Sequence, residues 1–556
     1  MRRSGLIVQF ANLGAGEVNT VMARDQLAPV DRAYIQAPLT PSAINCRLLA
    51  GVVSQRPGYR TIGTTPASSA VTGMFEATFD TNLVENLRSD AAGTYYLSGG
   101  TTWTSIVAPG TGGNWTYAMV RRAGSGSGNP ANQVMLSGDG DGDKVYVYQG
   151  GGVAAIETAT SYFKGPRAIV GHRGRALAAN VYDIGLSARK NKRIWYSIVG
   201  DPTAFTGFGS GFVDLDDDPY PIVNARVLGG NVCVFSGNNI AGSIVVGTLT
   251  GVTNAPYRWD TVGTEGVGLL VPRSLITVTP DLAFFLGHNG FYLYDGARGL
   301  APVAPGITRD ILTRINSAAL KTGFAWHKLT TGEVHVALAM GSATTPNETW
   351  VFNFPEKRVY GPYAFAHSMT SATAYATTDV VTWNDLVGTW DDQVGSWDTI
   401  GGIASSRGVM LGASNGTTWL DDETTFTDGG SPVAAVYTLA PIRASARTLI
   451  MPDGSQRPLE EDGYLTLHDI TVSYRNQGAW TPTVSVSIDG GTSWATATTG
   501  ASIGDGSTAL DSTRTAAYTF DGLSGVWFQA RISGSAPMQL AGVRMEFNYG
   551  GNYRND

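Results

Sequence analysis

The stretch that decides the fold runs from Gly171 to Pro221 and reads GHRGRALAANVYDIGLSARKNKRIWYSIVGDPTAFTGFGSGFVDLDDDPYP. A short apolar strand is expected at 175–179, and after a polar turn an aromatic strand is expected at 193–197. A third apolar segment, 212–215, leads into the acidic turn at 216–219. Short strands joined by tight turns predict an antiparallel sheet, of the kind that forms one blade of a radial array.

Units of the same kind recur along the chain, before and after this stretch. The strands that anchor them begin near residues 94, 144, 175, 231, 282, 333 and 408. Most intervals are about 50 residues, a period that short antiparallel strands show in a β-propeller. The repeats are too divergent to fix the number of blades. Between two of them, the apolar residues of 307–315 follow a helical spacing and predict one short helix.

Beyond about residue 430 the strands become longer and alternate more strictly. Segments such as 465–474 and 542–549 place an apolar residue at nearly every second position. This alternation is typical of two sheets packed face to face. We therefore predict an all-β fold with three parts: residues 1–70 as an extended N-terminal arm with the first strands, residues 71–428 as a β-propeller, and residues 429–556 as a β-sandwich.

Composition narrows the function classes. Charged residues make up 15% of the 556 residues, and the net charge is −7. This balance argues against a protein that binds nucleic acid by neutralising phosphates, although it allows an acidic channel through which DNA slides. No stretch reaches the roughly 20 apolar residues of a membrane helix, so we expect no membrane span. Cys46 and Cys233 have apolar neighbours, which favours two buried free thiols over a disulfide.

Two motifs resemble sites of known chemistry. Ser487 to Trp494 reads SIDGGTSW and fits the Asp-box pattern of sialidases and other propeller proteins. In physical terms it is a hairpin in which Asp489 binds turn amides and Trp494 packs beneath. It occurs once, in the predicted sandwich, so sialidase-like catalysis is not expected. The acidic run 139–143 has neither the glycine nor the glutamate of a calcium loop, which favours an acidic turn over a metal site.

A tryptophan repeat lies in a predicted loop within the propeller, residues 378–402. Trp383, Trp390 and Trp397 recur every seven residues, but Gly388 and Gly395 argue against a coiled coil. The repeat is interpreted as a loop in which each Trp packs on its own unit, or as an exposed aromatic interaction surface.

The sequence holds no recognisable catalytic pattern. It contains no Walker loop or nucleophile elbow, and the six histidines form no ligand-spaced pair. We therefore predict that the protein is not an enzyme, with no catalytic, cofactor-binding or metal-ligating residues and no cofactor.

Several short sequence motifs occur in an order that resembles that of one protein family. They are RPGY at 56–59, RIWYS at 193–197, VGDPT at 199–203, FVDL at 212–215 and LGHNGFYLYDG at 286–296. Together they resemble the tail proteins of double-stranded DNA bacteriophages, in particular the propeller-bearing nozzle (tail tubular or stabilisation) proteins of short-tailed phages. The tryptophan repeat and the closing sandwich are also similar to that family, and the resemblance spans residues 12–549.

The resemblance implies a structural virion protein. Its family forms a homo-oligomeric six-fold ring below the portal and adaptor, docks tail fibres or spikes, and lets genomic DNA pass without specific binding. The chain would be made in the host bacterial cytoplasm and end in the virion tail. No active site is carried over, because the matching phrases belong to the fold. Two alternatives stay open: a tail hub or head-closure protein of another tailed phage, and a glycan-binding or glycan-degrading propeller.

Overall fold

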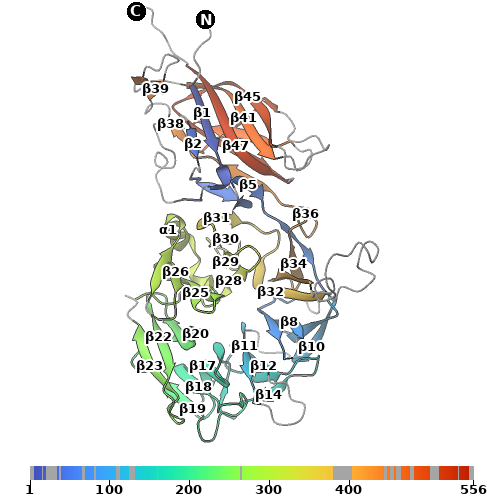
Figure 1. Cartoon of the computed structure of the whole chain (residues 1–556), viewed down its shortest axis with the longest axis vertical. Coiled ribbons are helices and arrows are strands. Elements are labelled where there is room, and N and C mark those ends of the chain that lie inside the picture. Colours follow the sequence, from blue (N-terminus) through green and yellow to red (C-terminus); the bar gives the residue numbers. More distant parts are fainter. Residues whose placement is uncertain are drawn as a thin grey trace, which may run out of the picture.

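A computed structural model gives the arrangement of the chain between residues 6 and 549. It does not describe residues 16, 21–33, 37–38, 50, 65–68, 81–82, 108–112, 124–131, 160, 263–265, 298, 380–403, 444–447, 451–455, 459–464, 476–480, 501–512 and 536. The predicted fold class is confirmed: the protein is all-β, with a β-propeller and a C-terminal β-sandwich (Figure 1).

Within the described residues, seven antiparallel sheets stand around a common centre. The strands of the first three blades are β7 (Gly73–Thr78), β8 (Val84–Asp90), β9 (Gly93–Ser98), β10 (Thr102–Val107); β11 (Trp115–Arg121), β12 (Asn132–Gly138), β13 (Val145–Tyr148), β14 (Ile156–Thr158); and β15 (Phe163–Lys164), β16 (Ala168–His172), β17 (Arg175–Asp183), β18 (Ala188–Tyr196), β19 (Gly211–Asp214). The stretch that opened the sequence analysis thus supplies most of the third blade.

The next three blades repeat the same order. Their strands are β20 (Ile222–Leu228), β21 (Asn231–Gly237), β22 (Gly242–Leu249), β23 (Tyr257–Val262); β24 (Ile276–Thr279), β25 (Leu282–Gly287), β26 (Gly290–Tyr294), β27 (Leu300–Val303); and β28 (Phe324–Lys328), β29 (Glu333–Leu338), β30 (Glu348–Asn353), β31 (Arg358–Tyr363). In each blade the first long strand lies innermost and later strands pair outward, because successive strands are joined by short turns.

The seventh blade is completed by a strand from the other end of the chain. Its strands are β32 (Met369–Asp379), β33 (Ala404–Ala413), β34 (Thr418–Asp422), β6 (Gly58–Thr61), β35 (Thr427–Asp428) and β36 (Ser431–Pro432). β6 pairs antiparallel with β34, from Trp419 opposite Thr61 to Asp422 opposite Gly58. This pairing covers the edge of β34 and joins residues more than 350 positions apart, so it closes the propeller.

The sandwich has one sheet of eight strands and one of six. The larger contains β1 (Leu6–Ala11), β2 (Tyr34–Gln36), β4 (Cys46–Leu49), β5 (Val52–Gln55), β41 (Leu465–Arg475), β44 (Thr499–Gly500), β45 (Thr513–Gly525) and β47 (Gln539–Tyr549). The smaller contains β3 (Ser42–Ile44), β37 (Ala435–Thr438), β38 (Ile442–Arg443), β42 (Thr483–Ser487), β43 (Ala495–Thr496) and β46 (Trp527–Gly534), and β39 (Thr448–Ile450) pairs with β40 (Gln456–Pro458) separately.

The two sheets of the sandwich pack face to face. Along β41 buried positions alternate with partly exposed ones, which gives the strand one apolar face, as the alternating sequence predicted. Across the interior, the rings of Phe528 and Phe547 meet edge to face with centroids 4.8 Å apart. The first and last described strands, β1 and β47, lie side by side and antiparallel in the larger sheet.

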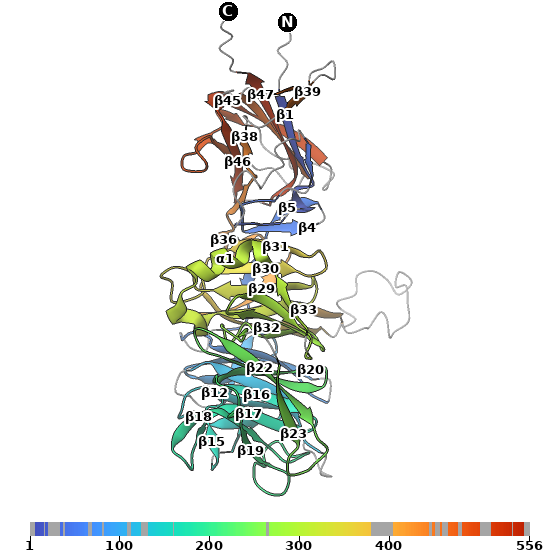
Figure 2. The ribbon, with the colours of Figure 1, turned by 90° about the vertical axis from the view of Figure 1, so that its left-hand side faces the viewer.

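Residues 1–70 supply strands to both blocks. β1 to β5 join the sheets of the sandwich, whereas β6 belongs to the seventh blade. The expected boundary near residue 428 lies in the β35–β36 hairpin of that blade. Figures 1 and 2 show the result, an elongated body in which the sandwich stands against the rim of the propeller near β31.

The short helix predicted for 307–315 is present as α1 (Pro305–Arg314). Pro305 suits the first turn, where its missing N–H has no helical partner to lose. Ile307 and Ile311 are fully buried, because the helix packs on blade five with one apolar face. Among the described helices none is long and apolar enough to span a membrane.

His172 gives the fold a testable pH dependence. It lies at the contact of blades three and four, where its Nδ1 is 2.9 Å from the Tyr257 hydroxyl and its Nε2 is 2.8 Å from the Gly230 carbonyl. Burial lowers the pKa of His172 below its ordinary value near 6.5. The unfolded chain therefore takes up this proton first, so the free energy of unfolding falls as the pH drops below about 6.5.

Urea unfolding at a series of pH values between 7.5 and 5.5 measures this effect. The half-buried His327 and the buried His335 also have lowered pKa values and add to the loss at acid pH. We expect His172→Asn to reduce the pH dependence relative to the wild type. An unchanged slope in this variant would contradict the assignment. His468, which is exposed, provides the control variant His468→Asn.

Candidate functional site

The central channel of the propeller is a cavity with a volume of about 1000 Å³. It is lined by residues of the innermost strand of every blade, namely β7, β11, β16, β20, β24, β28 and β32. Its walls are mainly apolar, as in ordinary small-molecule sites. The channel is therefore the place in this fold where all seven blades can contribute side chains to one ligand.

The charged side chains in the channel are mostly positive. Among the described lining residues, Arg167, Arg226, Arg273 and Lys321 are cationic and Asp139 is the one carboxylate. Burial raises the pKa of Asp139, although Arg167 and Lys321 act in the opposite direction. Four positive groups thus face one negative group, and the channel has an excess of positive charge in a chain whose net charge is −7.

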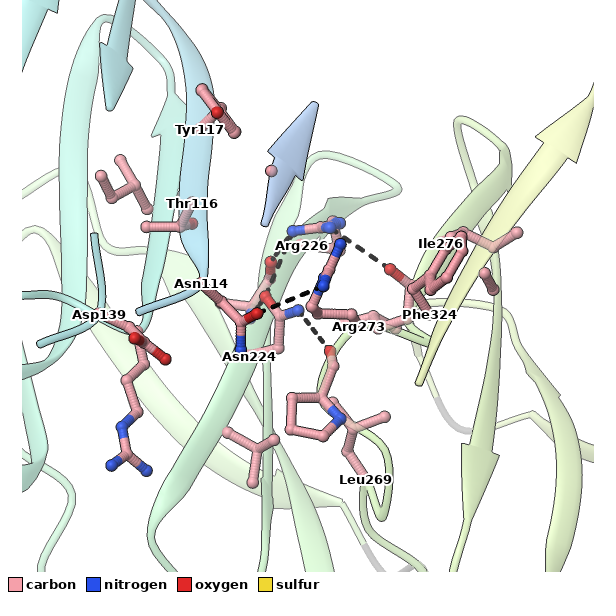
Figure 3. Close-up of a pocket in the computed structure, with 18 of the residues that line it drawn as sticks. Asn114, Thr116, Tyr117, Asp139, Asn224, Arg226, Leu269, Arg273, Ile276 and Phe324 are labelled. Carbon is pink, nitrogen blue, oxygen red and sulfur yellow. Dashed lines mark hydrogen bonds between the residues drawn. The ribbon is translucent and has the colours of Figure 1, made fainter. Parts of the chain in front are cut away.

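Arg226 is held by neutral groups on the wall of blades four and five (Figure 3). Its Nη1 donates to the Ala225 carbonyl at 3.0 Å, and its Nη2 donates to the Leu275 carbonyl at 3.3 Å. Asn224 stabilises the same wall by donating a hydrogen bond to the Pro272 carbonyl at 2.8 Å. These contacts fix the guanidinium without neutralising it.

Arg273 reaches across the channel. It precedes β24 of blade five, yet its Nη1 donates to Asn114 Oδ1 at 3.3 Å, next to β11 of blade two. The guanidinium also lies 5.4 Å from the centre of the Phe324 ring, which favours a cation at this place. Asn114 in turn donates to the Lys321 carbonyl at 3.5 Å, so polar contacts connect Arg273, Asn114 and Lys321. Figure 3 shows the contact between Arg273 and Asn114.

Both arginines are charged side chains that are only partly exposed. Withdrawal from water lowers the pKa of Arg226 and of Arg273 to about 10. Each still carries its charge at neutral pH. Their hydrogen-bond partners among the described residues are neutral carbonyl and amide oxygens. Cations withdrawn from water are normally paired with an anion, so the two guanidinium groups are available to an anionic ligand.

The predicted interaction residues Trp383, Trp390 and Trp397 lie outside the described residues. They fall in 380–403, the connection between β32 and β33 of the seventh blade.

The Asp-box stretch forms a self-contained turn after β42. The Ser493 hydroxyl donates to Asp489 Oδ2 at 2.5 Å, and the backbone amides of Ser493 and Thr492 donate to Asp489 Oδ1 at 2.9 and 3.0 Å. These bonds, that of the Ser493 hydroxyl most of all, hold the pKa of Asp489 well below its usual range. Trp494 Nε1 donates to the Gly491 carbonyl at 3.2 Å, and Arg531 lies over its ring. The carboxylate of Asp489 therefore stabilises the turn to which it belongs.

Carboxylates of the acidic turns also form hydrogen bonds and ion pairs with groups of the protein itself. Asp143 accepts from the Gly140 backbone at 2.9 Å, and Asp141 accepts from Arg189 Nε at 2.6 Å. On the third blade, Arg193 binds both oxygens of Asp214, at 2.8 and 2.6 Å. In the described part of the chain, no group of three or more His, Cys, Asp or Glu is arranged to hold a metal ion.

Sequence reasoning did not single out Arg226 or Arg273. A signal was present, because the two arginines are 273 − 226 = 47 residues apart, close to the blade period, with Arg226 inside β20 and Arg273 three residues before β24. Cys46 and Cys233, in contrast, are buried free thiols as predicted, and burial raises the pKa of Cys233 to about 12.

Comparisons with known proteins bear on the fold alone. No protein-family model matches the chain, and no curated protein matches it. Similar solved structures include the WD40 domain of Toxoplasma gondii coronin (9% identity over 68% of this chain and 86% of that chain, TM-score 0.32). Others are a subtype N11 neuraminidase-like protein of A/flat-faced bat/Peru/033/2010 (H18N11) (12% identity, 70% and 96%, TM-score 0.26) and an exo-β-1,3-galactanase of Phanerochaete chrysosporium (10% identity, 77% and 95%, TM-score 0.22).

Proposed function

We propose that the chain is a structural virion protein, the tail nozzle of a short-tailed bacteriophage. Copies of it form a closed ring, expected to be six-fold, below the portal and adaptor. Genomic DNA leaves through the ring, and tail fibres or spikes dock on it. The observation that carries the proposal is the junction between propeller and sandwich, which makes one stiff, elongated building block of two domains.

A continuous hydrophobic core supports this rigidity. It contains buried side chains of blades five and six, such as Phe284 and Trp350, together with Val472 and Val543 of the sandwich. Phe10 of β1 and the N-terminal residues Leu13 and Val18 are fully or almost fully buried in the same core. Bending the two blocks apart would expose this surface to water, at about 25 cal/mol for each Å² of apolar area.

Hydrogen bonds of the N-terminal segment connect the same blocks. The Val18 amide donates to the Val359 carbonyl at 2.9 Å, and the Asn45 amide donates to the Pro362 carbonyl at 3.0 Å. Arg47 on β4 forms a buried ion pair with Glu333 on β29, with Nε to Oε1 at 2.9 Å. A segment that is paired with both domains resists a hinge between them, because any hinge motion would break several of these bonds.

Stiff protomers of this shape suit a ring. Closed point-group symmetry lets identical surfaces repeat without open ends, and a fixed angle between domains keeps the rotation per subunit constant. The negative net charge is compatible with a lumen that does not hold DNA phosphates. Neither argument requires a reactive group, which agrees with the proposal that the protein is not an enzyme.

Sedimentation and electron microscopy of the purified full-length chain test this proposal. We expect concentration-dependent assembly into closed rings with a central hole wide enough for duplex DNA. A chain that stays monomeric at all concentrations, and that binds or hydrolyses glycans on an array, would support the alternative of a glycan-active propeller.

The tryptophan repeat offers a more specific prediction. If it is an interaction surface, replacing Trp383, Trp390 and Trp397 by Ser weakens ring assembly or fibre docking while the cooperative unfolding transition stays unchanged. If each Trp instead packs on its own unit, assembly is unaffected and only the local fluorescence changes. Native sedimentation combined with urea unfolding distinguishes these results.

A further inference from the structure

We propose that the central channel of the propeller binds a small organic oxyanion, with Arg226 and Arg273 as its recognition residues. This inference does not depend on the virion role. It rests on the positive excess in the channel, on the unused donors of the two arginines, and on the size and apolar character of the walls.

The charge balance points to an anionic occupant. Asp139, the single carboxylate among the described lining residues, forms no salt bridge with Arg226 or Arg273, although its charge acts on Arg273. A guanidinium that is partly withdrawn from water and has no paired anion is less stable than a paired one, and a bound anion would supply the missing charge. The surroundings of Arg226 therefore lack a countercharge, which an anionic ligand would supply.

The donors of the arginines point to an oxyanion in particular. A guanidinium has five N–H donors in one plane, which match two oxygens of a phosphate or carboxylate group. Arg273 uses Nη1 toward Asn114, which leaves Nε and Nη2 of this partly exposed side chain available to a ligand. Arg226 uses Nη1 and Nη2 toward carbonyl and amide oxygens, which leaves its Nε available. The existing bonds to carbonyl and amide oxygens orient both groups in advance.

The channel walls indicate the chemical character of the rest of the ligand, apart from its anionic group. Near the two arginines the channel is lined by Leu269, Ile276 and Phe324, and its volume of about 1000 Å³ accommodates a drug-sized molecule. A ligand with an anionic head and a partly apolar body fits this lining better than a free inorganic ion. Phosphate esters and carboxylic acids share this chemistry, and they are distinguished below by separate probes.

Calorimetric titration of the full-length protein with phenyl phosphate and with benzoate, at constant ionic strength set by chloride, tests the proposal. We expect saturable binding with one site per chain, and the tighter of the two probes identifies the source class. Arg226→Gln and Arg273→Gln should each weaken binding by about tenfold or more, because each removes a charge-assisted contact. Arg258→Gln is the matched control, because Arg258 lies exposed on the outer strand β23 beside Asp260.

A second measurement covers the case in which a channel variant fails to fold. Crystals of the wild-type protein soaked in 4-bromobenzoate or in 4-bromophenyl phosphate should show anomalous bromine density in the channel, with the anionic head within hydrogen-bond distance of Arg226 or Arg273. Equal affinities in wild type and both folded channel variants would overturn the proposal. So would the absence of saturable binding by either probe, or an empty channel after both soaks. None of these outcomes depends on whether rings form.

Discussion

Asp428→Asn lowers the free energy of unfolding by about 3–5 kcal/mol, since it leaves a buried guanidinium without its countercharge. Asp428 lies on β35 of the closing blade and binds both terminal nitrogens of Arg56, with Nη1 to Oδ1 at 2.8 Å. The side chains are 3% and 1% exposed, so water cannot replace the lost carboxylate oxygen. Urea unfolding followed by tryptophan fluorescence measures the loss.

The position of Arg56 explains why this pair matters more than an ordinary ion pair. Arg56 stands two residues before β6 and also donates to Asn45 Oδ1 at 2.9 Å and to the Ala364 carbonyl at 3.0 Å. It thereby joins the N-terminal segment, blade six and blade seven at one point. The control is Asp422→Asn in the same sheet, whose Arg60 partner is exposed and 3.6 Å away. We expect a loss of about 1 kcal/mol or less there; comparable losses in both variants would refute the account of the closure.

Gly58→Ala also destabilises the closing blade, through sterics and not through charge. A Cβ added at Gly58 would lie 2.1 Å from the Thr427 carbonyl oxygen and 2.7 Å from two further backbone atoms of Thr427. Backbone cannot rotate away as a side chain can, so β6 must separate from β35 or shift against β34. We expect a loss at or above the upper end of the about 1–3 kcal/mol typical of overpacking.

Hydrogen exchange of the amides in β6 and β34 localises this effect. In Gly58→Ala these amides should exchange faster, whereas the amides of blades two to four keep their protection. Gly408→Ala is the matched control in the same sheet, because its added Cβ would meet only the end of the Leu420 side chain, at 3.3 Å. Retained protection of β6 in Gly58→Ala would mean that the closing strand does not hold the blade.

Much of the propeller was predictable, because its signals are local. Each of the seven anchor strands proposed from the sequence lies in a different blade, from β9 in the first to β33 in the seventh. The sandwich strands were predictable for the same reason, since alternation along β41 reflects one buried face. Turn residues, and the alternation of apolar and polar residues along a strand, can be recognised within each segment alone.

The closure and the junction were not predictable, because they depend on distant partners. Residues 46–59 read as a strand that runs into a turn at 56–58, and nothing near them indicates pairing with β34. Residues 1–70 read as an extended arm with the first strands, yet Phe10 and Leu13 are fully buried in a core that also contains residues of blades five and six and of the sandwich. The channel arginines were missed for a related reason. An arginine in one strand shows no sign of a binding site, because the channel that it lines is formed only when the other blades surround it.

The most direct test of the proposed nozzle role is a cryo-electron microscopy map of tails assembled from this chain. We predict a closed ring of copies directly below the portal and adaptor, with propeller and sandwich fitting each subunit as one body at the angle of Figure 2. A continuous axial lumen should cross the ring, and fibres or spikes should contact its outside. A tail map without this chain in the ring, or one in which propeller and sandwich take different relative angles in equivalent subunits, would contradict the account.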